Sequence, residues 1–197
     1  MDTTPASGAI PIDQVPAVGD GDYEAMLVAR AQRDRNAFGD LYRLHHTVIA
    51  RYIHRRVGDT HLTEDLVADV FVIAMESIRR YRNRGVPFRA WLYRVASNRV
   101  NRWARRERKK LLVGAEAEFG ELPSPDALNM DQEIARERAR RALLCLPPKY
   151  QAVLALHYLE GMPVNDVATT LGCRVGTVKS RLSRGREQMR ALLKSGR

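Results

Sequence analysis

Cysteine is scarce in this chain of 197 residues: Cys145 and Cys173 are the only two, too few for a disulfide framework. They lack the C-x-x-C spacing of a metal or redox site, so we interpret both as small packing residues. Long apolar runs are also missing, since no stretch approaches the roughly 18 residues that a membrane span needs. The first residues include acids and no basic segment of the kind that opens a signal peptide. We therefore expect no membrane insertion and a cytoplasmic location.

Aromatic residues and acidic charge are both in short supply. Phe, Trp and Tyr make up 7% of the chain, which disfavours a sheet-rich core and fits compact helical units. Asp and Glu number 23 against 33 Lys and Arg, which gives a formal net charge of +10. This excess predicts a polyanionic partner, with nucleic acid ahead of an anionic membrane surface.

Apolar residues recur at helical spacing, and no alternating segment is long enough for a strand. We expect an all-α fold of two small helical domains joined by a flexible acidic linker. Residues 1–22 carry four acids and no Lys or Arg, without periodicity, which is typical of a disordered acidic tail. Residues 111–131 hold five acids, no Lys or Arg, and scattered Gly and Pro. The predicted units are therefore a first domain over 23–110, a linker over 111–130 and a second domain over 131–197.

Turn and capping residues predict several helix ends. A break is expected near 34–36, and Gly58 ends the next helix. Thr63 is the predicted N-cap of a helix that runs to about Tyr81. Its apolar face is expected to consist of Leu66, Val67, Val70, Phe71, Ala74 and Ile78.

Residues 163–178 have the pattern of a helix-turn-helix. Ala168 lets two helices approach closely, Gly172 permits a left-handed turn, and Val178 faces the core. From Arg174 to the end there are eight basic residues and one acid, which favours DNA contact over a merely solvated basic helix end. The residues expected to pack inward are Val178, Leu182, Met189, Leu192 and Leu193.

A second basic zone covers residues 88–110, with nine basic residues against one acid. Its aromatic residues offer surfaces on which unpaired bases could stack. At helical spacing at least two of these rings belong to the core, so we expect stacking only near the 82–88 loop. The aromatic residues are Phe88, Trp91, Tyr93 and Trp103.

A third motif, TEDLVADVF at 63–71, combines acidic and apolar residues on an otherwise basic protein. Glu64 and Asp65 can complement a helix N-terminus, but Asp69 lies beyond the first turn. The patch therefore favours docking to another protein. The five histidines form no H-E-x-x-H motif, and no nucleophile stands at a catalytic spacing, so we expect no catalytic residues, no metal and no cofactor.

Four motifs in order give the chain a family resemblance over about residues 23–193. They are TEDLVADVFVIAMESIRRY, PFRAWLYRVASNRVNRWARR, LPPKYQAVLALHYLEGMPVNDVATTLG and GTVKSRLSRGREQMRALL, with the acidic linker between the second and third. In this order the chain resembles an extracytoplasmic-function (ECF) sigma factor, a short member of the bacterial sigma-70 family. The resemblance implies a sigma factor that binds core RNA polymerase, recognises the −35 and −10 promoter elements and promotes DNA melting, without being an enzyme.

The resemblance also implies site residues and partners. The first domain would be region 2, which binds the polymerase clamp and the −10 element, and the second would be region 4, which binds the polymerase flap and the −35 element. Many relatives are held inactive by an anti-sigma factor, so one is expected as a partner here. The clamp residues implied are Asp65, Asp69, Val70 and Phe71; the −10 residues are Asn83, Arg84, Phe88, Arg89, Asn98, Arg99 and Arg102; the −35 residues are Thr177, Lys179, Ser180, Arg181 and Arg184.

Two other classes of protein share some of these features. An ordinary helix-turn-helix repressor or activator would bind duplex DNA alone, and the patch at 63–81 argues against it. A nuclease or ligase-like subunit would need a metal-binding carboxylate cluster, which the sequence does not display.

Overall fold

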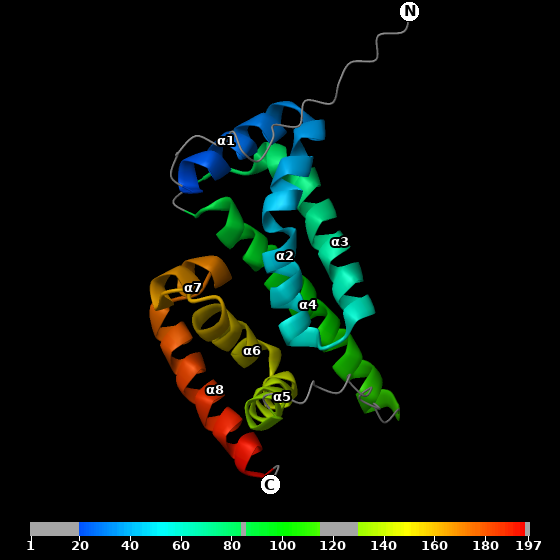
Figure 1. Cartoon of the computed structure of the whole chain (residues 1–197), viewed down its shortest axis with the longest axis vertical. Helices are drawn as coiled ribbons and strands as arrows, with labels where there is room; N and C mark the ends of the chain where they lie inside the picture. Colours follow the sequence, from blue (N-terminus) through cyan, green and yellow to red (C-terminus); the bar gives the residue numbers. More distant parts are fainter. Residues whose placement is uncertain (1–19, 84–85, 115–129, 196–197) are drawn as a thin grey trace, which may run out of the picture.

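The computed structural model describes residues 20–83, 86–114 and 130–195 (Figure 1). These residues form helices and turns, with no strand among them, which confirms the predicted all-α class. The predicted tail falls almost wholly outside the described residues, as do residues 115–129 of the predicted linker. The elements are α1 (Asp20–Arg33), η2 (Arg35–Ala37), α2 (Phe38–Val57), α3 (Thr60–Ser77), η3 (Ile78–Arg80), α4 (Phe88–Gly114), α5 (Met130–Cys145), α6 (Pro148–Leu154), η4 (Ala155–Leu159), α7 (Val164–Leu171) and α8 (Val175–Ser195).

The N-terminal unit, α1 to α4, is built on the apolar faces of α2, α3 and α4. Their inward residues recur at helical spacing and are withdrawn from water, which stabilises each fully buried large side chain by roughly 1.5–3 kcal/mol. A buried polar pair in this layer is satisfied internally, because Tyr52 Oη and Ser97 Oγ lie 2.7 Å apart in a hydrogen bond. Completely buried members include Leu41, Ile49, Ile53, Val70, Ala74, Leu92 and Val100.

The turn between α2 and α3 corrects one prediction. Gly58 has a left-handed backbone (φ +77°) and ends α2, as expected. The N-cap of α3 is Asp59, whose carboxylate accepts the N–H of Leu62 at 2.6 Å. Thr63 was the predicted cap, and that prediction is wrong: it lies inside α3 and its hydroxyl donates to the Asp59 carbonyl. The left-handed turn brings the very next residue into the extended capping conformation, so the helix starts earlier.

The C-terminal unit consists of α5 to α8. Pro148 begins α6 at the position where a missing N–H costs nothing, and the helix continues as a π-helical turn, η4. Gly161 follows with φ +69°. Helix α8 approaches α6 closely at Gly185, where an added Cβ would lie 3.1 Å from Leu154 Cδ1.

The two units pack on each other. Helix α4 lies against α6 and α7, and α2 lies against α5 and α6, so the buried residues of both units form one continuous core. Figure 1 shows α8 along the outer side of the C-terminal unit, away from α2 and α3. In the described part of the chain, no helix combines the length and the apolar character that crossing a bilayer requires.

Candidate nucleic-acid interface

Helices α7 and α8 form the predicted helix-turn-helix. Gly172 ends α7 in the left-handed conformation (φ +64°), and its N–H donates to the Thr169 carbonyl at 3.3 Å. The N–H of Cys173 donates to the Ala168 carbonyl at 3.0 Å, which completes a Schellman motif. Ala168 and Val178 are buried between the helices. Local sequence chemistry therefore determines the angle at which α8 leaves the turn.

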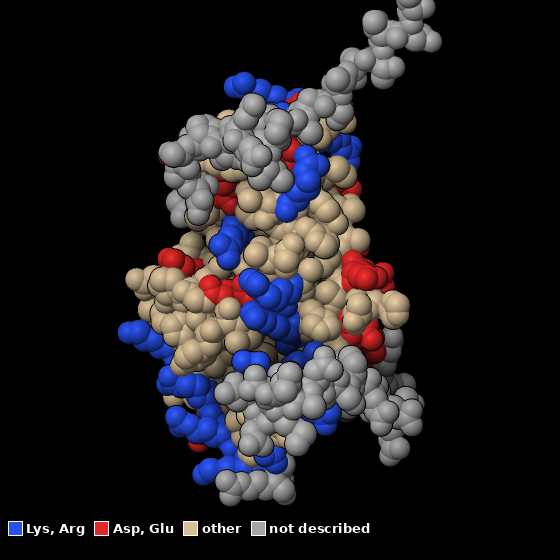
Figure 2. All heavy atoms as spheres, viewed as in Figure 1, with Lys and Arg blue, Asp and Glu red and all other residues tan. Residues whose placement is uncertain are grey.

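The outer face of α8 carries the basic residues. Lys179, Ser180 and Arg184 are exposed, and Thr177 and Arg181 are half-buried. Figure 2 shows Lys and Arg side chains gathered along this side of the molecule. Within the described residues, none of the three cations makes an ion pair, so their charge is available to phosphates. The prediction for the inner face holds for Val178 and Leu182 but is wrong for Leu192 and Leu193, which are 37% and 39% exposed because α8 extends beyond the helices it packs on.

The second basic zone lies on α4 and the segment before it. Asn83, Arg89, Asn98 and Arg102 are exposed, whereas Arg84 lies outside the described residues. Phe88 is only 1% exposed and packs edge-to-face on Tyr81, with ring centroids 5.3 Å apart. In this conformation its ring is not open to a base. The burial of Phe88 is therefore contrary to the stacking expected next to the 82–88 loop.

Arg89 is held by its neighbours on α4. Its guanidinium lies 3.5 Å from the Tyr93 hydroxyl and 5.7 Å from the ring centroid. The hydrogen bond to Tyr93 and the nearby carboxylates outweigh burial and raise the pKa of Arg89, so the side chain stays cationic. Burial and a hydrogen bond to Glu160 raise the pKa of Tyr93 to about 12, so the hydroxyl stays protonated.

Helix α3 presents the acidic patch. Asp65 is exposed, and Asp69 is half-buried in an ion pair with Arg99. Val70 and Phe71 lie in the core, with 0% and 5% exposed. They sit on the apolar face of α3, so they support the patch from beneath instead of forming its surface.

A different apolar residue completes the exposed face of α3. Val72 is 48% exposed and continues the stripe that starts at Asp65 and passes through Ala68 and Asp69. Figure 2 shows acidic side chains on this edge, opposite the basic side of α8. The position of Val72 on this face follows from the 3.6-residue period of a helix, because positions i, i+3, i+4 and i+7 share one face.

A buried carboxylate joins the two units. The Glu160 side chain is 1% exposed and accepts hydrogen bonds from Arg55 Nη1 at 2.8 Å and Tyr93 Oη at 2.7 Å. From the same helix as Tyr93, Arg94 donates to the Thr170 carbonyl at 2.8 Å, at the C-terminal end of α7. Sequence reasoning assigned Glu160 and Arg94 no role, and no local pattern marks them.

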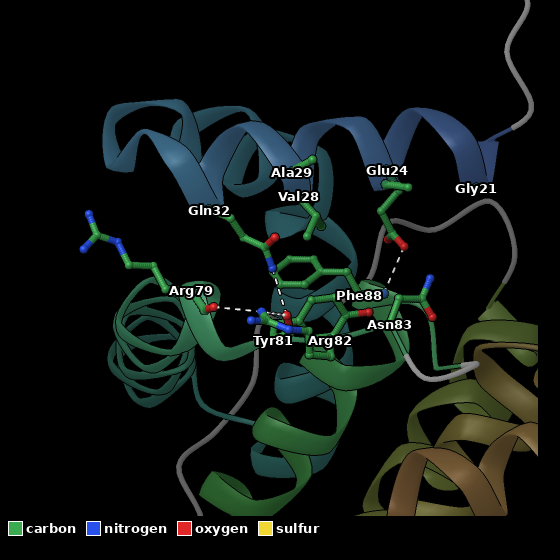
Figure 3. Close-up of a pocket in the computed structure, with 11 residues that line it drawn as sticks. Gly21, Glu24, Val28, Ala29, Gln32, Arg79, Tyr81, Arg82, Asn83 and Phe88 are labelled. Atoms are coloured by element: carbon green, nitrogen blue, oxygen red, sulfur yellow. Dashed lines mark hydrogen bonds between the residues drawn. The ribbon is translucent and has the colours of Figure 1, made fainter.

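A cavity of about 470 Å³ lies between α1 and the start of α4 (Figure 3). Glu24 and Gln32 of α1 face Tyr81 and Phe88 across it. Elsewhere, Cys145 is exposed and Cys173 half-buried, both as free thiols. Within the described ranges, no three His, Cys, Asp or Glu residues come together as a metal site.

Two family models match stretches of this chain. The family model described as Sigma-70 region 2 matches residues 41–110, and that described as Sigma-70, region 4 matches residues 136–189. The ECF RNA polymerase sigma factor SigL of Mycobacterium tuberculosis (strain ATCC 25618 / H37Rv) is 34% identical over 144 residues, which cover 72% of this chain and 80% of SigL.

A longer relative and a solved structure are also similar. The ECF RNA polymerase sigma factor SigE of Mycolicibacterium smegmatis is 29% identical over 161 residues; the match covers 80% of this chain but spans only 62% of SigE. The structure of CnrH in complex with the cytosolic domain of CnrY has a TM-score of 0.63 and 26% identity, and covers 87% of this chain and 97% of that chain.

The helical fold, the helix-turn-helix and its basic outer face define a DNA-binding protein of transcription. The two region matches, in order, narrow that class further. The chain belongs to the sigma-70 family of RNA polymerase sigma factors, in its ECF group.

Proposed function

We propose that this chain is an ECF sigma factor that binds core RNA polymerase, recognises the −35 and −10 promoter elements and promotes melting of the DNA, without catalysing a reaction itself. The observation that carries the proposal is the separation of two surfaces on one basic chain. Among the described residues, the cations on the outer face of α8 make no ion pairs, and the outer face of α3 is acidic and includes the exposed apolar residue Val72. The first surface suits DNA, and the second suits a protein.

In the proposed complex, α8 contacts the −35 element. Lys179 and Arg184 attract phosphates, and Arg181 can read guanine with two parallel hydrogen bonds. Thr177 and Ser180 have hydroxyls that reach either kind of group. Ser180 Oγ already donates to the Thr177 carbonyl at 3.2 Å, which keeps it close to the helix until DNA binds.

The −10 element is assigned to the start of α4 and the segment before it. Exposed Asn83, Arg89, Asn98 and Arg102 line the proposed path of the strand, with Arg99 anchored beside it by Asp69. Arg84, which lies outside the described residues, belongs to the same proposal. The role of Phe88 is now support: its buried ring fixes the backbone from which Arg89 projects.

Melting needs no catalytic group in this proposal. Unpairing and flipping a base costs a few kcal/mol, and contacts to the captured strand offset that cost. Binding at the −35 element and to polymerase raises the effective concentration of the −10 surface near its strand. Weak contacts at each surface therefore add up to promoter recognition.

The core polymerase clamp is the proposed partner of α3, through Asp65 and Asp69 at the surface with Val70 and Phe71 beneath them, and the flap is the proposed partner of the C-terminal unit. We also propose an anti-sigma factor as a partner. CnrH, which has the same fold, has been solved in complex with a protein domain, the cytosolic domain of CnrY. The proposed location is the cytoplasm, where core polymerase and DNA are.

The test is a fluorescence titration of labelled full-length protein with bacterial core RNA polymerase. Asp65→Arg reverses an exposed charge that makes no ion pair with any other described residue, so the fold should tolerate it. Like charges facing each other at an interface cost several kcal/mol, so the affinity should fall at least about tenfold.

Asp22→Arg makes the same charge change on exposed α1 and serves as the matched control. The proposal predicts that wild type and Asp22→Arg bind core polymerase with similar affinity. Absence of binding by folded wild type would contradict the proposal and leave a stand-alone DNA-binding regulator as the better account.

A further inference from the structure

Helix α1 holds both ends of the segment that connects α3 to α4, although it lies outside the region matched by the family model. Gln32 Nε2 donates to the carbonyls of Ile78 at 3.1 Å and Tyr81 at 2.8 Å, where the chain leaves η3. Eight residues earlier on α1, the Glu24 carboxylate binds the beginning of α4. Figure 3 shows the two side chains descending from α1 to the two ends of the segment.

Glu24 acts as the N-terminal cap of α4 from a different helix. Its two oxygens accept the N–H groups of Phe88 and Arg89, each at 3.0 Å. The residue before α4 is Pro87, whose side chain has no acceptor, and the first turn of α4 contains no acid of its own. The first N–H groups of a helix lack partners within it and carry partial positive charge, so a carboxylate there is favourable twice over.

His45 restrains the carboxylate from below. The imidazole is 4% exposed, and its Nε2 lies 3.1 Å from Glu24 Oε1. Its ring centroid is 5.7 Å from that of Phe88, so α2 supports both the cap and the capped residue. Burial alone would raise the pKa of Glu24, but the His45 contact and the two backbone N–H groups together hold it below its ordinary value of 4.5. The cap is therefore charged at neutral pH.

A hydrogen bond made by Tyr81 joins the two ends of the segment directly. The Tyr81 hydroxyl donates to the Val86 carbonyl at 2.7 Å and ties the departing end to the returning end. The described flanks of the segment thus have three braces, two of which originate on α1.

We propose that Glu24 is a positioning residue for −10 recognition. By capping α4 from α1, it sets the direction of Arg89 and of the chain that enters α4. Together with Gln32, it makes α1 contribute to the −10-binding unit. The inference rests on the proposed function and deepens it. Glu24 does not itself touch the DNA strand. It acts through the backbone of residues 88 and 89: the Arg89 side chain belongs to the proposed −10 surface, and the buried Phe88 ring supports the backbone beneath it.

The experiment uses holoenzyme assembled from core polymerase and the full chain. The probe is a promoter duplex selected from a random-sequence library by wild-type holoenzyme, together with a forked copy whose non-template −10 strand is unpaired. Glu24→Gln preserves the size of the side chain but removes its charge and one acceptor. Gln32→Met preserves size and removes the donor. Asp22→Asn, on the same helix and exposed, is the control for loss of an acidic charge.

The readout is the ratio of fork affinity to duplex affinity, measured well below each variant's melting temperature, with core binding measured in parallel. Glu24→Gln should lower the ratio about tenfold, a change typical of losing hydrogen bonds to a charged group. Gln32→Met should lower it in the same direction, Glu24→Asp should recover part of it, and Asp22→Asn should leave it unchanged. A purely structural role would reduce core binding and stability without changing the ratio, and that result would overturn the inference.

The outcomes separate this inference from the function beneath it. An unchanged ratio in folded Gln32→Met and Glu24→Gln, with a wild type that selects and opens a promoter, would overturn the positioning role alone. Failure of wild-type holoenzyme to select any promoter would overturn both. If Glu24→Gln does not fold, Gln32→Met decides the matter.

Discussion

Buried charged side chains hold the helices of this protein in register. Arg56 is 1% exposed and donates to Tyr52 Oη at 3.0 Å, Asn101 Oδ1 at 2.7 Å and the Pro148 carbonyl at 3.3 Å. A buried ion is tolerated only when protein groups replace its hydrogen bonds to water. Arg56 therefore requires a particular arrangement of the residues around it. Glu24, which is half-buried, makes contacts of the same kind, and its contribution can be tested by changing the pH.

We expect the fold to lose stability as the pH drops below about 4.5, because Glu24 then becomes protonated. The pKa of this carboxyl is lower in the folded protein than its ordinary value of 4.5. A lowered pKa means that ionised Glu24 favours the folded state; its contribution is complete above pH 4.5 and is lost as the pH falls through the folded value. Urea unfolding midpoints should therefore decline less steeply for Glu24→Gln than for wild type in this range.

Two ionisable groups near Glu24, Tyr81 and Arg89, do not titrate in this pH range. Burial and the Glu24 charge raise the pKa of Tyr81 to about 12, and Arg89 remains cationic, so neither changes state near pH 4.5. His45 Nε2 lies 3.1 Å from the Glu24 carboxylate, so the comparison tests this pair of side chains together. Asp22→Asn should keep the wild-type slope, and an equally steep decline in Glu24→Gln would refute the assignment.

At the scale of the element, α8 is a packed helix with one free face. Gly185 lets it lie close to α6, where an added Cβ would come 3.1 Å from Leu154 and 3.3 Å from Tyr150. On the same helix, Arg186 donates to the Tyr158 hydroxyl at 3.0 Å. These contacts fix the rotation of α8 about its axis, so the same side chains always point outward.

Replacing Lys179 and Arg184 together with Ala should weaken promoter binding by holoenzyme about tenfold and leave core polymerase binding intact. Each phosphate contact contributes about 0.9 to the slope of log affinity against log salt, so the slope should shrink by about 2. Promoter binding at several salt concentrations measures both quantities.

The matched control removes the same charge from the far end of α8. Arg190→Ala with Lys194→Ala changes two exposed residues beyond the predicted recognition face. If both pairs reduce affinity and slope equally, α8 contributes only diffuse charge, and the −35 assignment fails.

On the scale of the whole molecule, the two units are held together by contacts that bury Glu160. Arg55 and Tyr93 donate to it from α2 and α4, and Arg51 lies 3.7 Å away. The same contacts reach Arg89 through Tyr93, so the proposed −10 surface is coupled to the C-terminal unit. Separation of the units would leave these groups to water.

Glu160→Gln should loosen the contact between the units. The amide keeps the size of the side chain but leaves Arg55 without its ionic partner, a loss on the order of 2 kcal/mol. Small-angle scattering should show a larger radius of gyration, and thermal unfolding should broaden or split.

Glu137→Gln is the control, because Glu137 pairs with Arg140 and Arg141 within α5 and a surface pair of this kind is worth little. An unchanged scattering profile for Glu160→Gln would show that apolar packing alone holds the units together.

The sequence predicted the helices better than it predicted which of their side chains lie at the surface. It located the break between α1 and α2, the left-handed Gly172 and the inward positions of α3. It predicted Val70 and Phe71 both as residues of the apolar face of α3 and as residues that contact polymerase. Both are buried, so in this conformation they lie beneath the surface of α3. Phe88 was likewise expected near a base because it follows the loop, but it belongs to the core.

Helical periodicity, turn glycines and the uneven distribution of charge were determined by the sequence itself, because each depends on residues within a few positions of one another. The caps and latches were decided by tertiary structure. Glu24 meets Phe88 across 64 positions, Arg94 meets Thr170 across 76, and Arg55 meets Glu160 across 105. No local pattern encodes such pairs, because they form only after the apolar faces of the helices have packed together. Packing then brings charged side chains next to groups that are distant in the sequence.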